Sequence, residues 1–158
     1  MDRLVYLLNK NNLTIATAES CTGGLLGYNL STIPGASKYY KGTITAYNNN
    51  VKKDILKVPD IIFKNFQVIS KECAIEMVNG LKNIIEANIY VSITGNAGPT
   101  YNRDELRGVT YYAIIYNDSL QAGTIKCVNI ERTAVQKIIV KTIAKKIVDI
   151  IDKSETLS

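Results

Sequence analysis

The sequence predicts an α/β fold, a three-layer α/β/α sandwich around a mixed, mostly parallel central sheet. Segments with helical periodicity alternate with short apolar runs of strand length. One such run, residues 89–94, is apolar enough to lie in the middle of a sheet. Two later runs, 108–116 and 120–130, meet at Asn117-Asp118, a hairpin signal that makes part of the sheet antiparallel.

The first 37 residues predict a helix, a strand and a second helix. Residues 2–11 place leucines on one helical face and end at two asparagines. Residues 13–18 form a short, β-branched apolar run, which indicates a buried strand. A turn at Ser20 and a helix over 22–30 follow, and residues 31–37, which include Pro34-Gly35, indicate a loop.

The next segment predicts a second strand and two short helices. Residues 39–47 alternate between two faces as a strand does, and three successive asparagines, 48–50, end the alternation. Residues 51–57 and 61–65 have short helical patterns on either side of Pro59.

The second half begins with a capped helix. Ser70 is a typical N-cap, with Glu72 favourably placed in the first turn. We expect this helix to turn six apolar side chains inward: Cys73, Ala74, Met77, Leu81, Ile84 and Ile85. After the central strand, residues 95–99 form a glycine-punctuated loop. Beyond the hairpin, a long amphipathic helix is expected over about 133–152.

The composition indicates one ordinary globular domain. A chain of 158 residues accommodates a single core, expected over 1–153 with a flexible tail at 154–158. Hydrophobic residues make up 46% and charged residues 21%, no apolar run reaches the length of a membrane span, and the N-terminus does not resemble a signal peptide. We therefore expect a cytoplasmic protein without a membrane partner. Three widely spaced cysteines without a CxxC pair are expected to be reduced and not to bind metal.

The net charge of +5 raises the question of nucleic-acid binding. The densest lysine group lies on one side of the last predicted helix, and isoleucines lie on the other at helical spacing. A solvated helix face explains this pattern better than a phosphate-binding stripe, and no motif of interleaved aromatic and basic residues accompanies it. Nucleic acid is therefore not an expected partner.

The chain contains no histidine. This excludes Ser-His-Asp and Cys-His catalysis and histidine-ligated metal within the chain. A hydrolase with this sequence must use a lysine, a carboxylate or a tyrosine as its base.

Polar residues follow three of the predicted strands directly. In open α/β sheets, ligands bind at the carboxyl ends of strands, and glycine loops bring backbone amides close to a ligand. Three polar exits on one sheet predict a site at that edge. They are Glu19 to Gly24, Tyr47 to Lys52, and Thr94 to Pro99.

The residue types at these exits leave several roles open. Ser20 is either a helix N-cap or a nucleophile, and Thr22 can take the cap instead. Cys21 is either a nucleophile or a small buried thiol that packs under the helix. Glu19 can act as a base, bind a ribose hydroxyl or make a structural hydrogen bond. Lys52 alone is most simply a surface lysine.

The segment Thr17-Ala-Glu-Ser-Cys-Thr-Gly-Gly24 resembles the signature of the CinA C-terminal domain family. The resemblance covers nearly the whole chain in the family's order. It continues through 34–37, Lys41-Gly42, Tyr47 with Lys52, 68–72 and 92–99, and Arg132 resembles the arginine that opens the family's last helix. Enzymatic members of the family are nicotinamide mononucleotide (NMN) amidohydrolases, also called PncC.

The resemblance implies deamidation of NMN, in which NMN and water give nicotinate mononucleotide and ammonia. It aligns Ser20 with the nucleophile, Lys52 with the base and Tyr47 with an assisting hydroxyl. It further implies a three-layer fold, a homo-oligomer and no metal or organic cofactor. Many relatives carry a larger N-terminal domain, whereas here the domain is expected to stand alone.

The expected substrate contacts lie in the two glycine loops and at the last helix. Backbone amides of Cys21 to Gly23 are expected to stabilise the oxyanion, and the glycine loops and Arg132 to hold the ribose phosphate. The full set is Glu19, Cys21, Thr22, Gly23, Gly24, Thr94, Gly95, Ala97, Gly98 and Arg132.

The chain departs from the family pattern mainly at the presumed substrate rim. Thr43 and Glu131 stand where the family usually has glycines, and Asn96 where it usually has an aliphatic residue. Residues 100–107 lack the lysine of a Lys-Pro-Val-Gly segment, whose charge Arg103 or Arg107 can replace. The resemblance and these departures together give two alternative hypotheses. The chain is an NMN amidohydrolase, or it is a catalytically weak nucleotide-binding or regulatory domain that keeps the fold.

Overall fold

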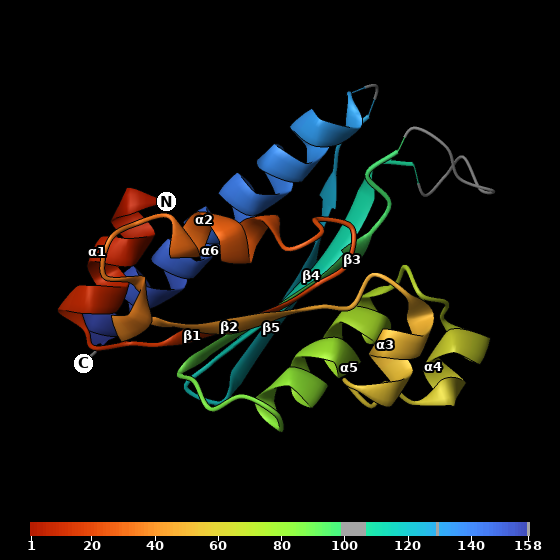
Figure 1. Ribbon diagram of the computed structural model, residues 1–158, viewed down its shortest axis with the longest axis horizontal. Helices are drawn as coiled ribbons and strands as arrows, with labels where there is room; N and C mark the ends of the chain where they lie inside the picture. Colours follow the sequence, from red (N-terminus) through yellow and green to blue (C-terminus); the bar gives the residue numbers. More distant parts are fainter. Residues whose placement is uncertain (99–106, 129, 158) are drawn as a thin grey trace.

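The computed structural model describes residues 1–98, 107–128 and 130–157 (Figure 1). Helices and strands alternate along the first part of the chain, and a hairpin and a long helix complete it. Their order is α1 (Asp2–Lys10), β1 (Ile15–Glu19), α2 (Leu25–Ser31), the 3-10 helix η1 (Ala36–Lys38), β2 (Tyr40–Thr45), α3 (Asn49–Asp54), α4 (Asp60–Asn65), α5 (Lys71–Lys82), β3 (Ile89–Gly95), β4 (Val109–Tyr116), β5 (Ser119–Lys126) and α6 (Arg132–Leu157).

The five strands form one mixed sheet in the order β2-β1-β3-β4-β5. β1 pairs in parallel with both β2 and β3, so the carboxyl ends of these three strands lie at one edge. β4 pairs antiparallel with β3 and with β5. Asn117 and Asp118 join β4 to β5 with φ angles of 50° and 58°, as a two-residue hairpin turn requires. The predicted fold class, central strand and hairpin are confirmed.

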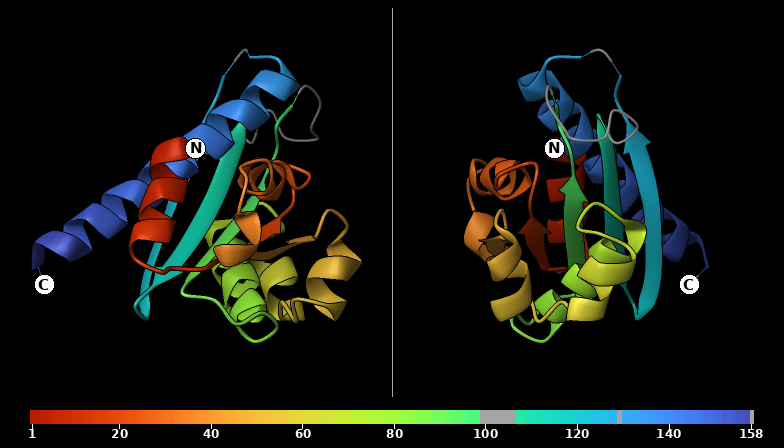
Figure 2. Two further views of the ribbon diagram at one scale, coloured as in Figure 1. Left: turned by 60° about the vertical axis from the view of Figure 1, so that its left-hand side comes forward. Right: turned by 90° about the vertical axis from the view of Figure 1, so that its right-hand side faces the viewer.

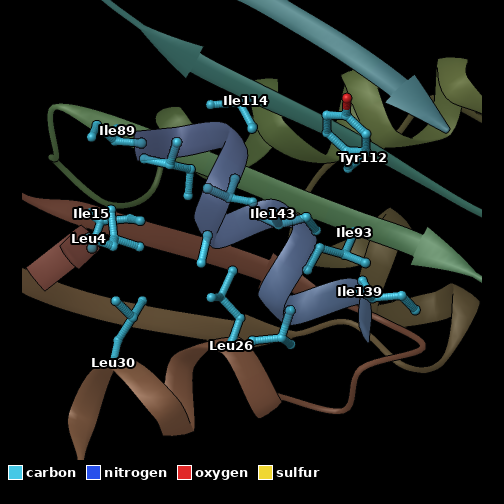
Figure 3. Packing of buried hydrophobic residues seen from close by; sticks show 14 of the residues in the cluster. Leu4, Ile15, Leu26, Leu30, Ile89, Ile93, Tyr112, Ile114, Ile139 and Ile143 are labelled. Carbon is cyan, nitrogen blue, oxygen red and sulfur yellow. The ribbon is translucent and has the colours of Figure 1, made fainter. Parts of the chain in front are cut away.

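Helices cover both faces of the sheet (Figures 1 and 2). α1, α2 and α6 pack on one face, and α3, α4 and α5 pack on the other. One hydrophobic cluster lies between the sheet and each of these two helix layers. Figure 3 shows Ile139 and Ile143 of α6 packed among Leu26 of α2 and Ile93 of β3. The exposed side of α6 carries Lys137, Lys141 and Lys145, as the solvated-face interpretation predicts.

Three elements near the site start elsewhere than predicted. β1 covers 15–19, so Glu19 is its last residue, and α2 begins at Leu25 instead of Thr22. The glycine pair explains the delay, because Gly23 and Gly24 have φ angles of 61° and 95°, which a right-handed helix excludes. α3 begins at Asn49, two residues early, because the Asn48 side chain caps it by accepting from the Asn50 amide at 2.8 Å.

α5 begins as predicted and ends earlier. The Ser70 hydroxyl accepts a hydrogen bond from the Cys73 amide at 3.0 Å, which confirms the N-cap. The helix ends at Lys82, and Ile84, predicted to face inward, is 48% exposed.

The end of the chain also differs from the prediction. α6 continues to Leu157, so residues 154–157 form a helix and not the loose tail that was expected. Glu155 explains part of this extension, because its carboxylate accepts from Lys10 Nζ at 2.9 Å and from Asn11 Nδ2 at 2.8 Å. Within the described ranges, no helix has both the length and the apolar composition needed to cross a membrane.

Candidate active site

The three polar strand exits converge on one cavity of about 380 Å³. It lies at the carboxyl edge of β1, β2 and β3, where the predicted site was expected, and the start of α6 contributes to its wall. Its lining comprises Ser20, Cys21, Tyr47, Asn49, Lys52, Val68, Ile69, Thr94, Gly95, Asn96, Ala97 and Arg132.

Ser20 stands in a tight turn between β1 and α2. Its backbone amide donates to the Ile93 carbonyl of β3 at 3.0 Å, and its own carbonyl accepts from the Gly23 amide at 2.9 Å. The N-cap of α2 is Gly24, which makes no side-chain capping bond. The N-cap interpretation is therefore wrong for both Ser20 and Thr22, and the Ser20 hydroxyl remains available to the cavity.

Lys52 and Ser20 meet in this cavity although they lie 32 positions apart. Lys52 Nζ donates to Ser20 Oγ at 3.0 Å and to the Ala46 carbonyl at 2.8 Å. The Lys52 side chain is only 1% exposed, so the surface-lysine interpretation is wrong for this residue. It holds for the adjacent Lys53, which is 40% exposed and pairs with Asp60.

Burial lowers the pKa of Lys52 below its ordinary value, because desolvation disfavours the ammonium form. No carboxylate in the described part of the chain pairs with its Nζ. The charged forms of the neighbouring Cys73 and Cys21 would raise the pKa of Lys52. Burial in turn raises the pKa of each thiol to about 11, so both are neutral near pH 7. Lys52 therefore reaches its neutral, basic form more readily than an exposed lysine.

Cys21 is poorly suited to nucleophilic attack. Its thiol is 4% exposed, and its raised pKa keeps it protonated near neutrality. Its Sγ lies 3.9 Å from Thr110 Oγ1, and its carbonyl accepts from Gln136 Nε2 of α6 at 2.8 Å. These contacts favour the packing interpretation of the Cys21 side chain.

Arg132 and Tyr47 form a pair at the cavity wall. Arg132 is the first residue of α6; its Nη1 donates to the Gly98 carbonyl at 2.6 Å and its Nη2 to Tyr47 Oη at 2.9 Å. Tyr47 is 60% exposed. Since Lys52 contacts Ser20 directly, no tyrosine relay between them is needed in this arrangement.

Glu19 lies outside the cavity lining and is fully buried beneath the turn. Its carboxylate accepts from the Thr22 hydroxyl at 2.6 Å, the Gly27 amide at 2.8 Å, the Leu26 amide at 3.1 Å and the Thr17 hydroxyl at 3.1 Å. Of its three open roles, this environment favours the structural hydrogen bond. The carboxylate satisfies amides at the start of α2 that Gly24 has no side chain to cap.

The predicted substrate contacts thus divide into two groups. Cys21, Thr94, Gly95, Ala97 and Arg132 line the cavity, whereas Glu19, Thr22, Gly23, Gly24 and Gly98 do not. Residues 100–107, the segment that departs from the family pattern, lie outside the described residues except for the last of them, Arg107.

Four lining residues were not among the named catalytic and substrate contacts: Asn49, Val68, Ile69 and Asn96. Asn49 and Asn96 nevertheless lie within two of the predicted strand exits. Thr94 brings Val68 to the site, because its hydroxyl donates to the Val68 carbonyl at 2.9 Å. The signal for Val68 and Ile69 was their place in the family motif at 68–72, and the signal for Asn96 was its departure from an aliphatic pattern.

The charges of the cavity suit an anionic ligand. Among the described residues, its lining contains two basic side chains, Lys52 and Arg132, and no acidic one. Among the residues that the structure describes, no three histidine, cysteine, aspartate or glutamate side chains cluster closely enough to hold a metal ion. The arrangement therefore offers a serine with a buried lysine, an apolar wall and a cation at the side.

A model of the CinA C-terminal domain family matches residues 1–151. A CinA-like protein of Pseudothermotoga lettingae is 37% identical over 120 residues, which cover 76% of this chain and 30% of that protein. A putative competence-damage inducible protein of Halalkalibacterium halodurans is 38% identical over 118 residues, which cover 75% of this chain and 28% of that protein. The chain thus spans about three tenths of these relatives' length.

Solved structures share the fold over almost the whole chain. The crystal structure of competence/damage inducible protein CihA from Agrobacterium tumefaciens has a TM-score of 0.89 at 28% identity, covering 94% of this chain and 91% of that one. A competence or damage-inducible protein from Enterobacter asburiae has a TM-score of 0.90 at 24% identity, covering 95% and 94%. The second likeness bears on the fold alone.

Proposed function

The chain belongs to the CinA C-terminal domain family, and we propose that it is an amidohydrolase that converts NMN and water to nicotinate mononucleotide and ammonia. The observation that carries the proposal is the buried contact of 3.0 Å between Lys52 Nζ and Ser20 Oγ inside the cavity. It joins a hydroxyl to a base whose pKa burial lowers, which is what a Ser-Lys amidohydrolase needs.

In the acylation step, Ser20 Oγ attacks the carboxamide carbon. Neutral Lys52 has one lone pair and two N–H groups; an N–H donates to the Ala46 carbonyl and the lone pair accepts the Ser20 proton. The Ala46 contact, at 2.8 Å, fixes the direction of the amine. Lys52 then gives this proton to the departing nitrogen, and ammonia leaves an acyl-enzyme on Ser20. Water, deprotonated by Lys52 in turn, then attacks the acyl carbon. Lys52 returns the proton to Ser20 Oγ as the C–Oγ bond breaks, and the acid is released.

The developing oxyanion needs donors near Ser20. The expected donors were the amides of Cys21 to Gly23, but the Gly23 amide already donates to the Ser20 carbonyl. Ser20's own amide is also engaged, with Ile93. Of the predicted donors that leaves Cys21 and Thr22, and only Cys21 lines the cavity. We assign the Cys21 amide as the principal backbone donor, a role worth about 3–4 kcal/mol in comparable sites.

The remaining lining residues suit a nicotinamide nucleotide. Val68, Ile69 and Ala97 offer an apolar wall for a flat pyridine ring. The Arg132 guanidinium, oriented by Gly98 and Tyr47, offers its charge to a phosphate. Ribose between the two groups would then lie along the wall. The resemblance also implies a homo-oligomer, which light scattering coupled to size-exclusion chromatography tests.

The alternative is a nucleotide-binding or regulatory domain with weak catalysis. The departures from the family pattern near the cavity, Asn96 among them, favour it. The buried Ser20-Lys52 contact favours the enzyme, because it holds the amine against a hydroxyl, and nucleotide binding alone does not require that contact.

Incubation of the purified protein with NMN separates the two functions. The enzyme releases ammonia and nicotinate mononucleotide in equal amounts, measured by a coupled ammonia assay and by chromatography. Binding of NMN by calorimetry without either product supports the regulatory domain and rejects the amidohydrolase.

A further inference from the structure

Asn96 presents a buried hydrogen-bond donor without a partner in the candidate active site. The residue lines the cavity and is 7% exposed. Its Oδ1 accepts from the Gly98 amide at 2.8 Å, which fixes the orientation of the side-chain amide, because an amide nitrogen cannot accept that bond. Its Nδ2 is buried and has no acceptor among the described residues.

An unpaired buried donor is unfavourable for folding. Leaving such a group without a partner costs about 1–3 kcal/mol. An aliphatic residue, usual at this position in the family pattern, would avoid the cost. The accepting half of Asn96 has a structural partner in Gly98, so the donating half is the part that still needs an explanation. A ligand that supplies an acceptor inside the cavity explains it.

The position of Asn96 indicates which part of a ligand it meets. β3 runs parallel to β1 and pairs Ile93 with Glu19, so the chain leaving β3 passes beside the Ser20 turn. Ser20 and Asn96 both line the cavity and both are more than nine-tenths buried. Arg132, the cation proposed for the phosphate, is half-buried at the side. The Asn96 donor therefore belongs with the reacting end of the substrate.

We propose that Asn96 Nδ2 donates a hydrogen bond to the carbonyl oxygen of the substrate's carboxamide, which makes Asn96 a catalytic residue of this site. The assignment rests on the proposed amidohydrolase function. As the bond from Ser20 Oγ to the amide carbon forms, the carbonyl π electrons move to the oxygen and the Ser20 proton passes to Lys52. The Asn96 N–H then binds the negative oxygen together with the Cys21 amide, as side-chain amides do in other oxyanion holes.

Two variants separate the donor from the structural half of the side chain. Asn96→Asp keeps an oxygen for the Gly98 amide and removes the donor, whereas Asn96→Leu removes both. For each variant, kcat and KM for NMN are measured, with thermal unfolding as the check on folding. Asn50→Leu is the matched control, because Asn50 is exposed on α3, next to a residue of the cavity lining, and does not line the cavity itself.

We expect kcat to fall about 10²- to 10³-fold in both Asn96 variants, with a smaller change in KM. In Asn50→Leu, kcat should stay close to the wild-type value. A purely structural role predicts instead that Asn96→Asp keeps its kcat and Asn96→Leu loses it, which overturns the assignment. A rise in KM at unchanged kcat also overturns it, because the donor would then serve the ribose or phosphate. If wild-type protein releases no ammonia, the proposed function itself fails; an active wild type with equally active Asn96 variants rejects only the role of Asn96.

Discussion

Replacement of Lys52 by methionine tests the electrostatic basis of the site. Methionine is about as long as lysine and carries no charge, so the variant removes the base and the buried amine together. General-base catalysis contributes about 10²- to 10⁴-fold to a rate, and we expect ammonia release to fall by at least that factor. In wild-type protein, kcat/KM should rise with pH up to an inflection that lies below 10.5, because only neutral Lys52 acts and burial lowers its pKa.

The same variant makes a prediction about stability. The pKa of Lys52 is lower in the folded than in the unfolded chain, so within the pH window between the two values the unfolded chain binds more protons. As pH falls through that window, wild-type stability therefore decreases, by about 1.36 kcal/mol for each unit by which folding lowers the pKa. Below the folded-state pKa the loss is constant. Above the window, wild type keeps the advantage of the Ala46 hydrogen bond, which is worth about 1 kcal/mol.

The measurement is urea unfolding of wild type and Lys52→Met across pH 6 to 11. The difference in unfolding free energy should move in favour of the methionine variant as pH falls from about 10.5 and then level off; titrations common to both proteins cancel. Lys53→Met is the matched control, because Lys53 is partly exposed and its pair with Asp60 is screened by water. It should keep its turnover and show no such trend. A pH-independent difference between wild type and Lys52→Met would refute the lowered pKa and, with it, the account of Lys52 as a base.

Two further predictions concern the cation and the buried carboxylate. Arg132→Ala should raise the KM for NMN about 10- to 100-fold, because a charged hydrogen bond to the phosphate is lost. The KM for nicotinamide riboside, which has no phosphate, should stay nearly constant. An equal increase in KM for both substrates in steady-state kinetics would reject the phosphate role. Glu19→Gln should lower the free energy of unfolding by about 1–3 kcal/mol, because the new NH2 group faces hydrogen-bond donors at the start of α2; an unchanged urea midpoint would show that these contacts contribute little.

Much of the fold was predictable because local chemistry and tertiary structure agree. The Ser70 cap, the Asn117-Asp118 turn and the apolar run of β3 each specify their element within a few residues. The boundaries that failed depend on backbone geometry or distant contacts. Gly23 and Gly24 delay α2 because both adopt positive φ, and the last turn of α6 is linked to the first helix through Glu155.

The location of the candidate site was predictable from the sequence, but the roles of its residues were less so. Polar residues at three strand exits indicate that a ligand binds at the carboxyl ends of these strands, whatever the register of the sheet. That Lys52 is buried against Ser20, however, depends on how α3 packs, and a lysine beside another lysine gives no local sign of it. For Glu19, at the end of β1, the sequence leaves a catalytic base, a ribose contact and a structural role open, and only the fold directs its carboxylate to the amides of α2.

The most direct test of the Ser20-Lys52 site is ammonia release from NMN by wild type and Ser20→Ala, compared at equal concentration after both are shown to be folded. Wild type should form nicotinate mononucleotide and ammonia in equal amounts. Ser20→Ala should release ammonia more than about 10³-fold more slowly than wild type. Substantial residual turnover in Ser20→Ala that disappears when Cys21 is also replaced by alanine would move the nucleophile to Cys21 and contradict the account.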